Sequence, residues 1–181
     1  MAILKIVREK HPSSPREWDN LGVMACWHPR YDLGDVQPKK SPNEWMAENV
    51  PEGSVVLPLY LYDHSGISMS TGREYPFNCQ WDSMQVGWIV CASDRIRKEY
   101  GAEEITAEIR EKVEKVLQAE VGTYDDYLRG EVYGYVVLDK HGETLDSCWD
   151  FIGGDIEACG LADNIPTEHL PYLQEAWDGR N

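Results

Sequence analysis

The sequence predicts an α+β fold: a mostly antiparallel sheet with one long helix on one face and an irregular helical tail. Three observations predict it. Short apolar runs typical of strands recur along the chain, one long segment has apolar residues at helical spacing, and strands cluster instead of alternating with helices. A length of 181 residues is typical of one domain, so we expect residues 1–181 to form a single domain.

The first half begins with two short strands. Residues 3–7 alternate apolar and charged side chains, which is typical of a half-buried or edge strand, and residues 22–27 form a second apolar run. Residues 28–53 contain four prolines and are predicted to be irregular. Within them, residues 42–49 are predicted to form one short helix with Ser41 as its N-cap.

The most apolar run, residues 55–62, predicts a buried strand that contains Pro58. Because proline has no N–H to give to a ladder, Pro58 indicates either an edge strand or a bulge. Residues 66–70 are expected to pair back on this strand as a hairpin, and residues 85–91 predict a further buried strand.

Two helices are expected next. Ser93 and Gly101 are suitable as the N-cap and the stop of a helix over residues 94–100. The longest helical pattern follows, with Gly122 as a candidate kink and Gly130 as its end. Its apolar positions are Ile105, Ile109, Val113, Val116, Leu117, Val121, Tyr124 and Leu128.

The last third predicts a hairpin and a short helix. Residues 132–138 and 143–149 have strand patterns, and residues 139–142 between them are typical of a turn. A final helix is expected near residues 169–177.

Negative charge is concentrated toward the C-terminus. The formal net charge is −15, and residues 139–181 hold ten carboxylates opposed only by Lys140 and Arg180. Such a field repels nucleic acid and attracts basic surfaces, so it favours a protein partner over a reaction. In the long helix, Glu104, Glu108 and Glu111 also form a line, but pairing with lysines four residues on makes a solvated face the favoured interpretation there.

We therefore predict a binding surface on the C-terminal segment, called here the acidic surface. Its residues are Glu143, Asp146, Asp150, Asp155, Glu157 and Asp163. Trp149, Phe151 and Trp177 lie among them in sequence and are candidate aromatic anchors for docking. Calcium binding is an alternative, although the spacing does not match an EF-hand loop.

A second set of residues has the chemistry of a metal site. Cys26, His28, His64 and Cys79 would make a Cys2His2 set, for which zinc is the candidate cofactor. The spacing lacks the close ligand pairs of a zinc knuckle, so buried reduced thiols beside hydrogen-bonded histidines are the favoured interpretation.

The same region suggests a hydrolase as the alternative function. His64 follows Asp63 at the end of an apolar strand, where a histidine can act as a general base, and Cys79 or Ser83 would be the nucleophile. No Gly-x-Ser-x-Gly elbow and no phosphate-binding loop occurs in the sequence. The simpler interpretation of residues 63–66 is a tight turn with Gly66 at positive φ.

The cysteine pattern and hydropathy predict a soluble intracellular protein. The five cysteines form no CxxC pair and are expected to be reduced thiols in the cytoplasm. No apolar run approaches the ~20 residues that a transmembrane helix needs, so no membrane association is expected.

Several segments together resemble an uncharacterised family carried by phages and mobile elements of gut bacteria. The segments are DNLG at 19–22, CWH at 26–28, YDLGD at 31–35, PLYLYDHSG at 58–66, WD at 81–82, QVG at 85–87, YGY at 133–135 and DSCW at 146–149. The usual loop of that family is Tyr-Asn-Leu-Gly-Asp, so Asp32 is a departure. The family brings no catalytic residues to this chain.

What the resemblance implies is a setting, the accessory genes of mobile elements, in which small acidic proteins often act in counter-defence. We therefore expect an inhibitor of a nucleic-acid-targeting nuclease, with a Cas9-type effector favoured, that acts as a DNA mimic in the cytoplasm of a bacterial host. An accessory module of a replication or transfer complex would use the same acidic surface. The sequence leaves open whether nucleic acid is touched directly and whether any catalysis occurs, although an enzyme is the less favoured prediction.

Overall fold

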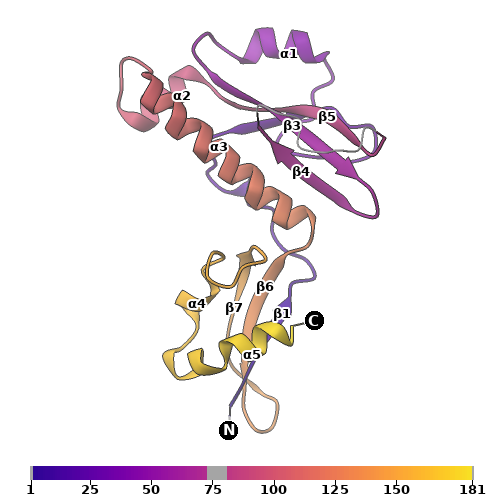
Figure 1. Cartoon of the computed structure of the whole chain (residues 1–181), viewed down its shortest axis with the longest axis vertical. Helices are drawn as coiled ribbons and strands as arrows, with labels where there is room; N and C mark the ends of the chain where they lie inside the picture. The colour runs from indigo at the N-terminus through magenta and orange to yellow at the C-terminus, as the bar shows by residue number, and fades with distance from the viewer. Residues whose placement is uncertain (1, 73–80, 181) are drawn as a thin grey trace. The chain divides into compact units, whose positions relative to one another are not determined.

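The computed structural model describes residues 2–72 and 81–180 and confirms an α+β fold with two antiparallel sheets (Figure 1). The chain divides into two compact units. Unit 1 comprises Met1–Pro15 and Asp126–Asn181, and unit 2 comprises Arg16–Asp125. Each unit contains one of the sheets. The expected single domain over residues 1–181 stays a prediction, because a grouping of contacts does not tell whether the units fold together.

Unit 2 is built on a four-stranded sheet with the order β2-β5-β3-β4, in which all neighbours are antiparallel. Its strands are β2 (Val23–Cys26), β3 (Val55–Asp63), β4 (Ile67–Thr71) and β5 (Ser83–Cys91). The helices are α1 (Pro42–Asn49), α2 (Ser93–Tyr100) and α3 (Ala107–Leu128), and a short 3-10 turn, η1, covers Pro15–Glu17.

The long helix α3 packs against this sheet, as the sequence predicted (Figure 1). Its buried residues are Val113, Leu117, Val121 and Tyr124, a single stripe at helical spacing. Gly22 marks the closest approach, because a Cβ there would lie only 2.5 Å from Leu117 Cδ2 and 2.7 Å from Ile89 Cγ1. Glycine at this position lets α3 reach the sheet.

The shorter helices of unit 2 test the predicted caps. Ser41 forms a complete capping box with Glu44, and α1 has the predicted bounds. For α2 the predicted N-cap is wrong: the cap is Ala92, and Ser93 is the first helical residue, buried, with its N–H donated to Ser54 Oγ at 3.2 Å. The hydroxyl of Ser54, just before β3, therefore accepts the N–H of the first helical residue, and no pattern in the sequence near Ser93 indicates this contact.

Pro58 lies in an interior strand of the sheet, so an edge position is wrong. β3 pairs with β5 on one side and β4 on the other, and the β3–β5 register shifts between Leu59 and Tyr60. The alternative of a bulge therefore describes this region, although Pro58 itself pairs with Trp88 in register and the irregularity follows Leu59. The carbonyl of Pro58 accepts a hydrogen bond from Thr71 Oγ1 at 2.6 Å, which ties the proline to β4.

Helix α3 runs without interruption past Gly122, so the suggested kink or split does not occur. The helix begins at Ala107, two residues later than the apolar pattern suggested. Gly130, in the left-handed region at φ 74°, follows its end. Within the described residues, no helix is long and apolar enough to span a membrane.

Unit 1 holds a three-stranded sheet with the order β1-β6-β7. Its elements are β1 (Ile3–Arg8), β6 (Val132–Leu138), β7 (Thr144–Ile152), α4 (Leu161–Asn164), the 3-10 turn η2 (Thr167–Tyr172) and α5 (Leu173–Asp178). One face of the sheet forms the core with the helical tail: Leu4, Ile6, Tyr133, Tyr135, Val137, Phe151, Leu161, Ile165, Leu173 and Trp177.

The outer parts of this sheet stay open to solvent. Three large apolar side chains there are strongly exposed: Ile3 at 52%, Leu145 at 63% and Trp149 at 41%. Trp149 lies over Gly134, where a Cβ would come within 2.2 Å of its ring. Of the three predicted aromatic anchors, Phe151 and Trp177 are core residues, because the periodicity of β7 and α5 turns them inward. Trp149 alone of the three is available to a partner.

Candidate functional site

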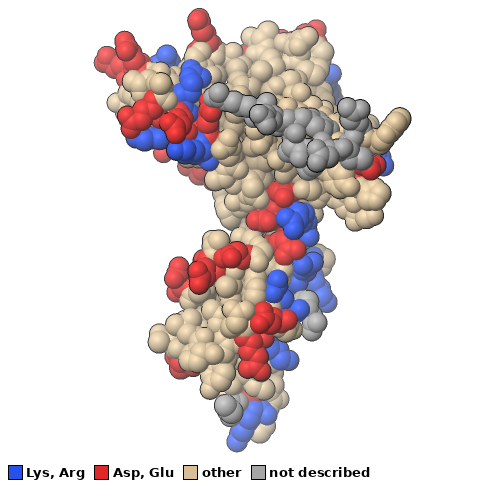
Figure 2. All heavy atoms as spheres, viewed as in Figure 1, with Lys and Arg blue, Asp and Glu red and all other residues tan. Residues whose placement is uncertain are grey.

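The six residues of the acidic surface all lie in unit 1, and all are exposed. They occupy three consecutive features: the hairpin and strand β7, the turn that follows β7, and α4. Figure 2 shows acidic side chains on one margin of unit 1 and, on the other margin, basic side chains with acidic ones among them.

Two of the six carboxylates have structural roles. Asp146 Oδ2 lies 2.9 Å from the hydroxyl of Tyr135, whose oxygen is also 3.1 Å from the carbonyl of Asn164. Asp146 thereby joins β7 to the end of α4. Burial and this hydrogen bond raise the pKa of Tyr135 to about 12. Asp155 accepts the N–H groups of Glu157 and Ala158 at 3.0 and 2.8 Å, which fixes the turn after β7.

The other four carboxylates are unpaired. Within residues 2–72 and 81–180, no side-chain hydrogen bond or ion pair is formed by Glu143, Asp150, Glu157 and Asp163. The two cations nearest in sequence are placed elsewhere: Arg180 stacks 4.1 Å over the ring of Trp177, and Lys140 lines a hollow beside β1. Because no cation of the protein neutralises these solvated carboxylates, their negative charge can attract a basic partner.

Asp150 adds a conformational feature to this surface. Its φ is 67°, in the left-handed region that few residues other than glycine, asparagine and aspartate adopt. It follows Trp149 directly, and its N–H is donated to Glu9 Oε2 at 3.2 Å. The exposed ring and the free carboxylate are therefore held next to each other on strand β7.

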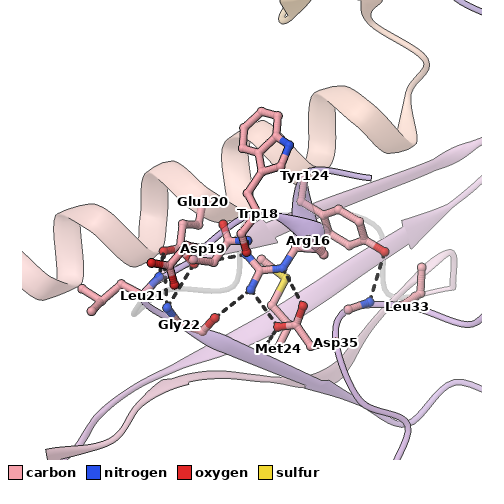
Figure 3. A network of polar contacts seen from close by, with 12 residues as sticks. Arg16, Trp18, Asp19, Leu21, Gly22, Met24, Leu33, Asp35, Glu120 and Tyr124 are labelled. Atoms are coloured by element: carbon pink, nitrogen blue, oxygen red, sulfur yellow. Dashed lines mark hydrogen bonds and ion pairs between the residues drawn. The ribbon is translucent and has the colours of Figure 1, made fainter. Parts of the chain in front are cut away.

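Several segments that carry the family resemblance meet in a structural network in unit 2, which sequence reasoning did not identify (Figure 3). The guanidinium of Arg16, with a side chain only 5% exposed, binds Asp35 at 2.7 Å, Glu120 at 3.1 Å and the carbonyl of Gly22 at 2.7 Å. The N–H of Met24 is donated to the same Asp35 carboxylate at 2.6 Å. One buried cation thus connects the DNLG segment, the YDLGD loop and α3.

The network has two further contacts to α3. Glu120 also accepts the N–H of Leu21 at 2.6 Å, and the hydroxyl of Tyr124 accepts the N–H of Gly34 at 3.1 Å (Figure 3). Gly34 has φ 68°, and a Cβ there would lie 2.8 Å from the carbonyl oxygen of Met24. Glycine is required at this turn, so the two motifs are explained by folding and do not indicate a reaction.

A pocket of about 440 Å³ lies at the end of β3 in unit 2, near part of the predicted metal set. It is lined by His28, Arg30, Leu61, Asp63, Trp81, Asp82, Ser83 and Met84. Arg30 pairs with Asp63, and Trp81 at the rim is 95% exposed. His64, beyond the end of β3, lies with its Nδ1 3.3 Å from Asp82 Oδ2.

The histidine of this pocket is held by its own loop. His28 Nδ1 accepts the N–H groups of Arg30 and Tyr31 at 3.3 and 3.2 Å, and its ring stacks on Tyr31 with centroids 4.9 Å apart. Burial, followed by the charge of Arg30, lowers the pKa of His28, so its imidazole is neutral near pH 7. Because Nδ1 of this neutral ring already accepts two hydrogen bonds, only Nε2 is left to contact a ligand or substrate.

The predicted zinc set is not assembled by the described residues. Cys26 is buried on β2, outside the pocket lining, and burial raises its thiol pKa to about 12. Cys79 lies outside the described residues. Among residues 2–72 and 81–180, no three histidine, cysteine or carboxylate side chains form a group that could hold a metal ion. Residues 63–66 form a tight turn, with His64 N–H donated to the Gly66 carbonyl at 3.0 Å.

No family model, curated protein or solved structure matches the chain. Its function therefore has to be inferred from its own residues.

Proposed function

We propose that this protein is a binding protein of the counter-defence type, which inhibits a nucleic-acid-targeting nuclease by docking its acidic surface into a basic channel. A Cas9-type effector is the favoured partner, because such effectors hold the guide and target duplex in a positively charged channel. The resemblance to phage and mobile-element proteins and the cytoplasm of a bacterial host stay part of this proposal.

The observation that carries the proposal is a segment without Lys or Arg, residues 143–163, that presents four exposed carboxylates without partners: Glu143, Asp150, Glu157 and Asp163. A folded protein gains little by keeping unpaired like charges on one small unit, since they repel one another. A basic partner would neutralise them and would displace no internal ion pair in doing so. Trp149 next to Asp150 supplies the kind of aromatic side chain that anchors interfaces.

The test uses two variants of equal charge. The first carries Glu143→Gln, Asp150→Asn, Glu157→Gln and Asp163→Asn, and it leaves Asp146 and Asp155 intact because those two support the fold. Asparagine at 150 tolerates the positive φ. The matched control carries Glu52→Gln, Glu99→Gln, Glu103→Gln and Glu104→Gln, all exposed positions of unit 2.

Both variants and the unmodified protein are titrated against a purified Cas9–guide complex while DNA cleavage and complex formation are measured. The proposal expects inhibition by the unmodified protein and the control, and a loss of ~10-fold or more in affinity for the first variant. Equal affinity of both variants, with the fold of each confirmed by circular dichroism, would refute a role for the acidic surface. If the Cas9–guide complex still cleaves its DNA completely at a saturating concentration of this protein, a Cas9-type effector is not the partner.

The alternative of a metal-assisted hydrolase is supported by the pocket that places His28, Asp63, Asp82 and Ser83 around one hollow. It lacks a described ligand set, and the buried Cys26 thiol is protonated at neutral pH. Elemental analysis of protein purified without added metal tests it. One zinc per chain that is lost in a His28→Ala and His64→Ala variant would favour the hydrolase, and zinc-free protein with unchanged partner binding would exclude it.

A further inference from the structure

The strand β1 of unit 1 has one unpaired edge. In the three-stranded sheet it is the terminal strand, paired with β6 alone among the described residues. Beside it lies a hollow of about 960 Å³. Its lining is Ala2, Ile3, Leu4, Lys5, Ile6, Val7 and Lys140 on the strand side and Tyr172, Glu175, Ala176 and Gly179 on the side of the helical tail.

The ladder between β1 and β6 determines which backbone groups point into the hollow. The N–H of Glu9 is donated to the carbonyl of Val132 at 2.8 Å, which places this pair at a hydrogen-bonded position of the ladder. The antiparallel register continues without a shift along the strand, and hydrogen-bonded pairs alternate with non-bonded ones. Ile3, Lys5 and Val7 therefore bond to β6, whereas the N–H and C=O groups of Leu4 and Ile6 point away from the sheet.

We propose that this edge is a docking site for an extended acidic segment of a partner protein, which adds as a fourth strand beside β1. An added strand gives main-chain hydrogen bonds to the outward groups of Leu4 and Ile6, and its side chains alternate between the two faces of the sheet. The hollow is lined on its other side by Tyr172 at the end of η2, by Glu175 and Ala176 of α5, and by Gly179.

The residues on the two faces of the hollow determine which side chains of the added strand would fit on each face. On the side of the tail, Ala176 and Gly179 are small, and Glu175 is negative, so an apolar side chain of the added strand is accommodated there. On the other face, Lys5 lies between Ile3 and Val7, and Lys140 lies at the hairpin near the start of β1. Carboxylates on that face would meet two exposed lysines. The expected ligand alternates acidic and apolar residues.

The same charges disfavour a second copy pairing through its own β1. Antiparallel pairing of two β1 strands would bring the Lys5 side chains of the two copies near each other, and like charges across a sheet are destabilising. A partner strand with carboxylates removes this repulsion. The site is independent of the acidic surface, because it uses the basic edge of the sheet and the opposite sign of charge.

The test uses the full chain and a fluorescent six-residue peptide of alternating glutamate and valine as the probe. The control probe has lysine in place of glutamate. Two further probes carry N-methyl groups on alternate residues, one set on the glutamates and the other on the valines, so that only one of them blocks the edge that faces β1. We expect the acidic probe to bind, the lysine probe not to bind, and one methylated probe to lose binding while the other keeps it.

Protein variants and amide exchange complete the test. Lys5→Glu with Lys140→Glu should weaken the acidic probe by ~10-fold or more, whereas Lys10→Glu with Lys98→Glu, also exposed, should leave it unchanged. Binding should slow amide exchange at Leu4 and Ile6 but not at Lys5 and Val7, which are already bonded. Equal binding of both methylated probes, tight binding by the Lys5 and Lys140 variant, or dimers that the probe does not dissociate would each overturn the proposal.

Discussion

The two units carry almost the same net charge and use it differently. Unit 1 has six Lys and Arg against thirteen Asp and Glu, and unit 2 has eleven against nineteen, for net charges of −7 and −8. In unit 2, ion pairs neutralise some carboxylates within the unit, as in Arg16–Asp35, Arg16–Glu120, Lys112–Glu108 and Lys115–Glu111, whereas Glu52, Glu99, Glu103 and Glu104 are exposed and form no side-chain pair among the described residues. In unit 1, four exposed carboxylates have no partner. Neither net charge nor pairing alone therefore locates a binding surface. What the unit 1 carboxylates add is that all four lie in one segment, residues 143–163, that contains no Lys or Arg.

The largest expected effect is the loss of unfolding free energy when Arg16, at the centre of the network in unit 2, is replaced. Arg16→Met removes the cation that binds both Asp35 and Glu120, and leaves two poorly exposed carboxylates facing each other. Breaking a buried ion pair by removing one partner costs about 3–5 kcal/mol, which we expect as loss of unfolding free energy in urea titrations. Arg16→Lys keeps the charge without the planar fork and should lose less. A loss below 1 kcal/mol for Arg16→Met, on this scale, would show that the network does not hold unit 2.

The second prediction compares one carboxylate from each unit. Glu120→Gln removes a charge that binds Arg16 and the N–H of Leu21, so we expect a loss of about 1.5–3 kcal/mol, typical of hydrogen bonds to charged groups. Glu157→Gln changes an exposed, unpaired carboxylate and should stay within about 0.5 kcal/mol of the unmodified protein. Urea unfolding of the two variants under identical conditions measures the difference. Equal losses would remove the distinction between the units.

Much of the fold could be predicted, because local pattern determines it. The strand and helix patterns, the Ser41 cap and the Gly101 stop follow from side-chain spacing and capping chemistry. The division of the strands between two sheets could not be predicted, since the chain brings β1 to β6 across more than 120 residues. Ser93 failed for the same reason, because its partner Ser54 lies on a distant segment.

The candidate site was predicted in part. The acidic surface residues are exposed on one unit, as their charge suggested, but the roles of Asp146 and Asp155 in the fold depend on Tyr135 and on a turn, which composition does not show. The position of Phe151 and Trp177 among carboxylates in the sequence predicts anchors, yet both side chains belong to the core of unit 1. The Arg16 network left no signal in the local sequence, because Glu120 lies 104 residues along the chain from Arg16.

The smallest expected effect concerns buried thiols in unit 2. Burial raises the pKa of Cys26 to about 12 and that of Cys91 to about 11, from an ordinary value of 9.0. A raised folded pKa stabilises the protein fully below the unfolded pKa, and the contribution is lost as pH rises from 9 toward those values. The loss at pH 9 is only ~0.4 kcal/mol per thiol.

Iodoacetamide labelling at pH 9 with mass spectrometry measures this protection directly. Cys26 and Cys91 should remain unmodified in the native protein and react in urea. If native Cys26 is labelled as fast as Cys26 in urea, that would contradict its burial on strand β2 of unit 2.

The most direct test of the central claim is the salt dependence of affinity for a Cas9–guide complex. It should be measured for the unmodified protein, the variant at Glu143, Asp150, Glu157 and Asp163, and the matched unit 2 variant. If unpaired carboxylates of unit 1 carry the binding, affinity falls steeply with salt for the unmodified protein and the unit 2 variant, and the unit 1 variant has a distinctly shallower slope. Identical slopes for all three proteins, or no binding at low salt, would contradict the account.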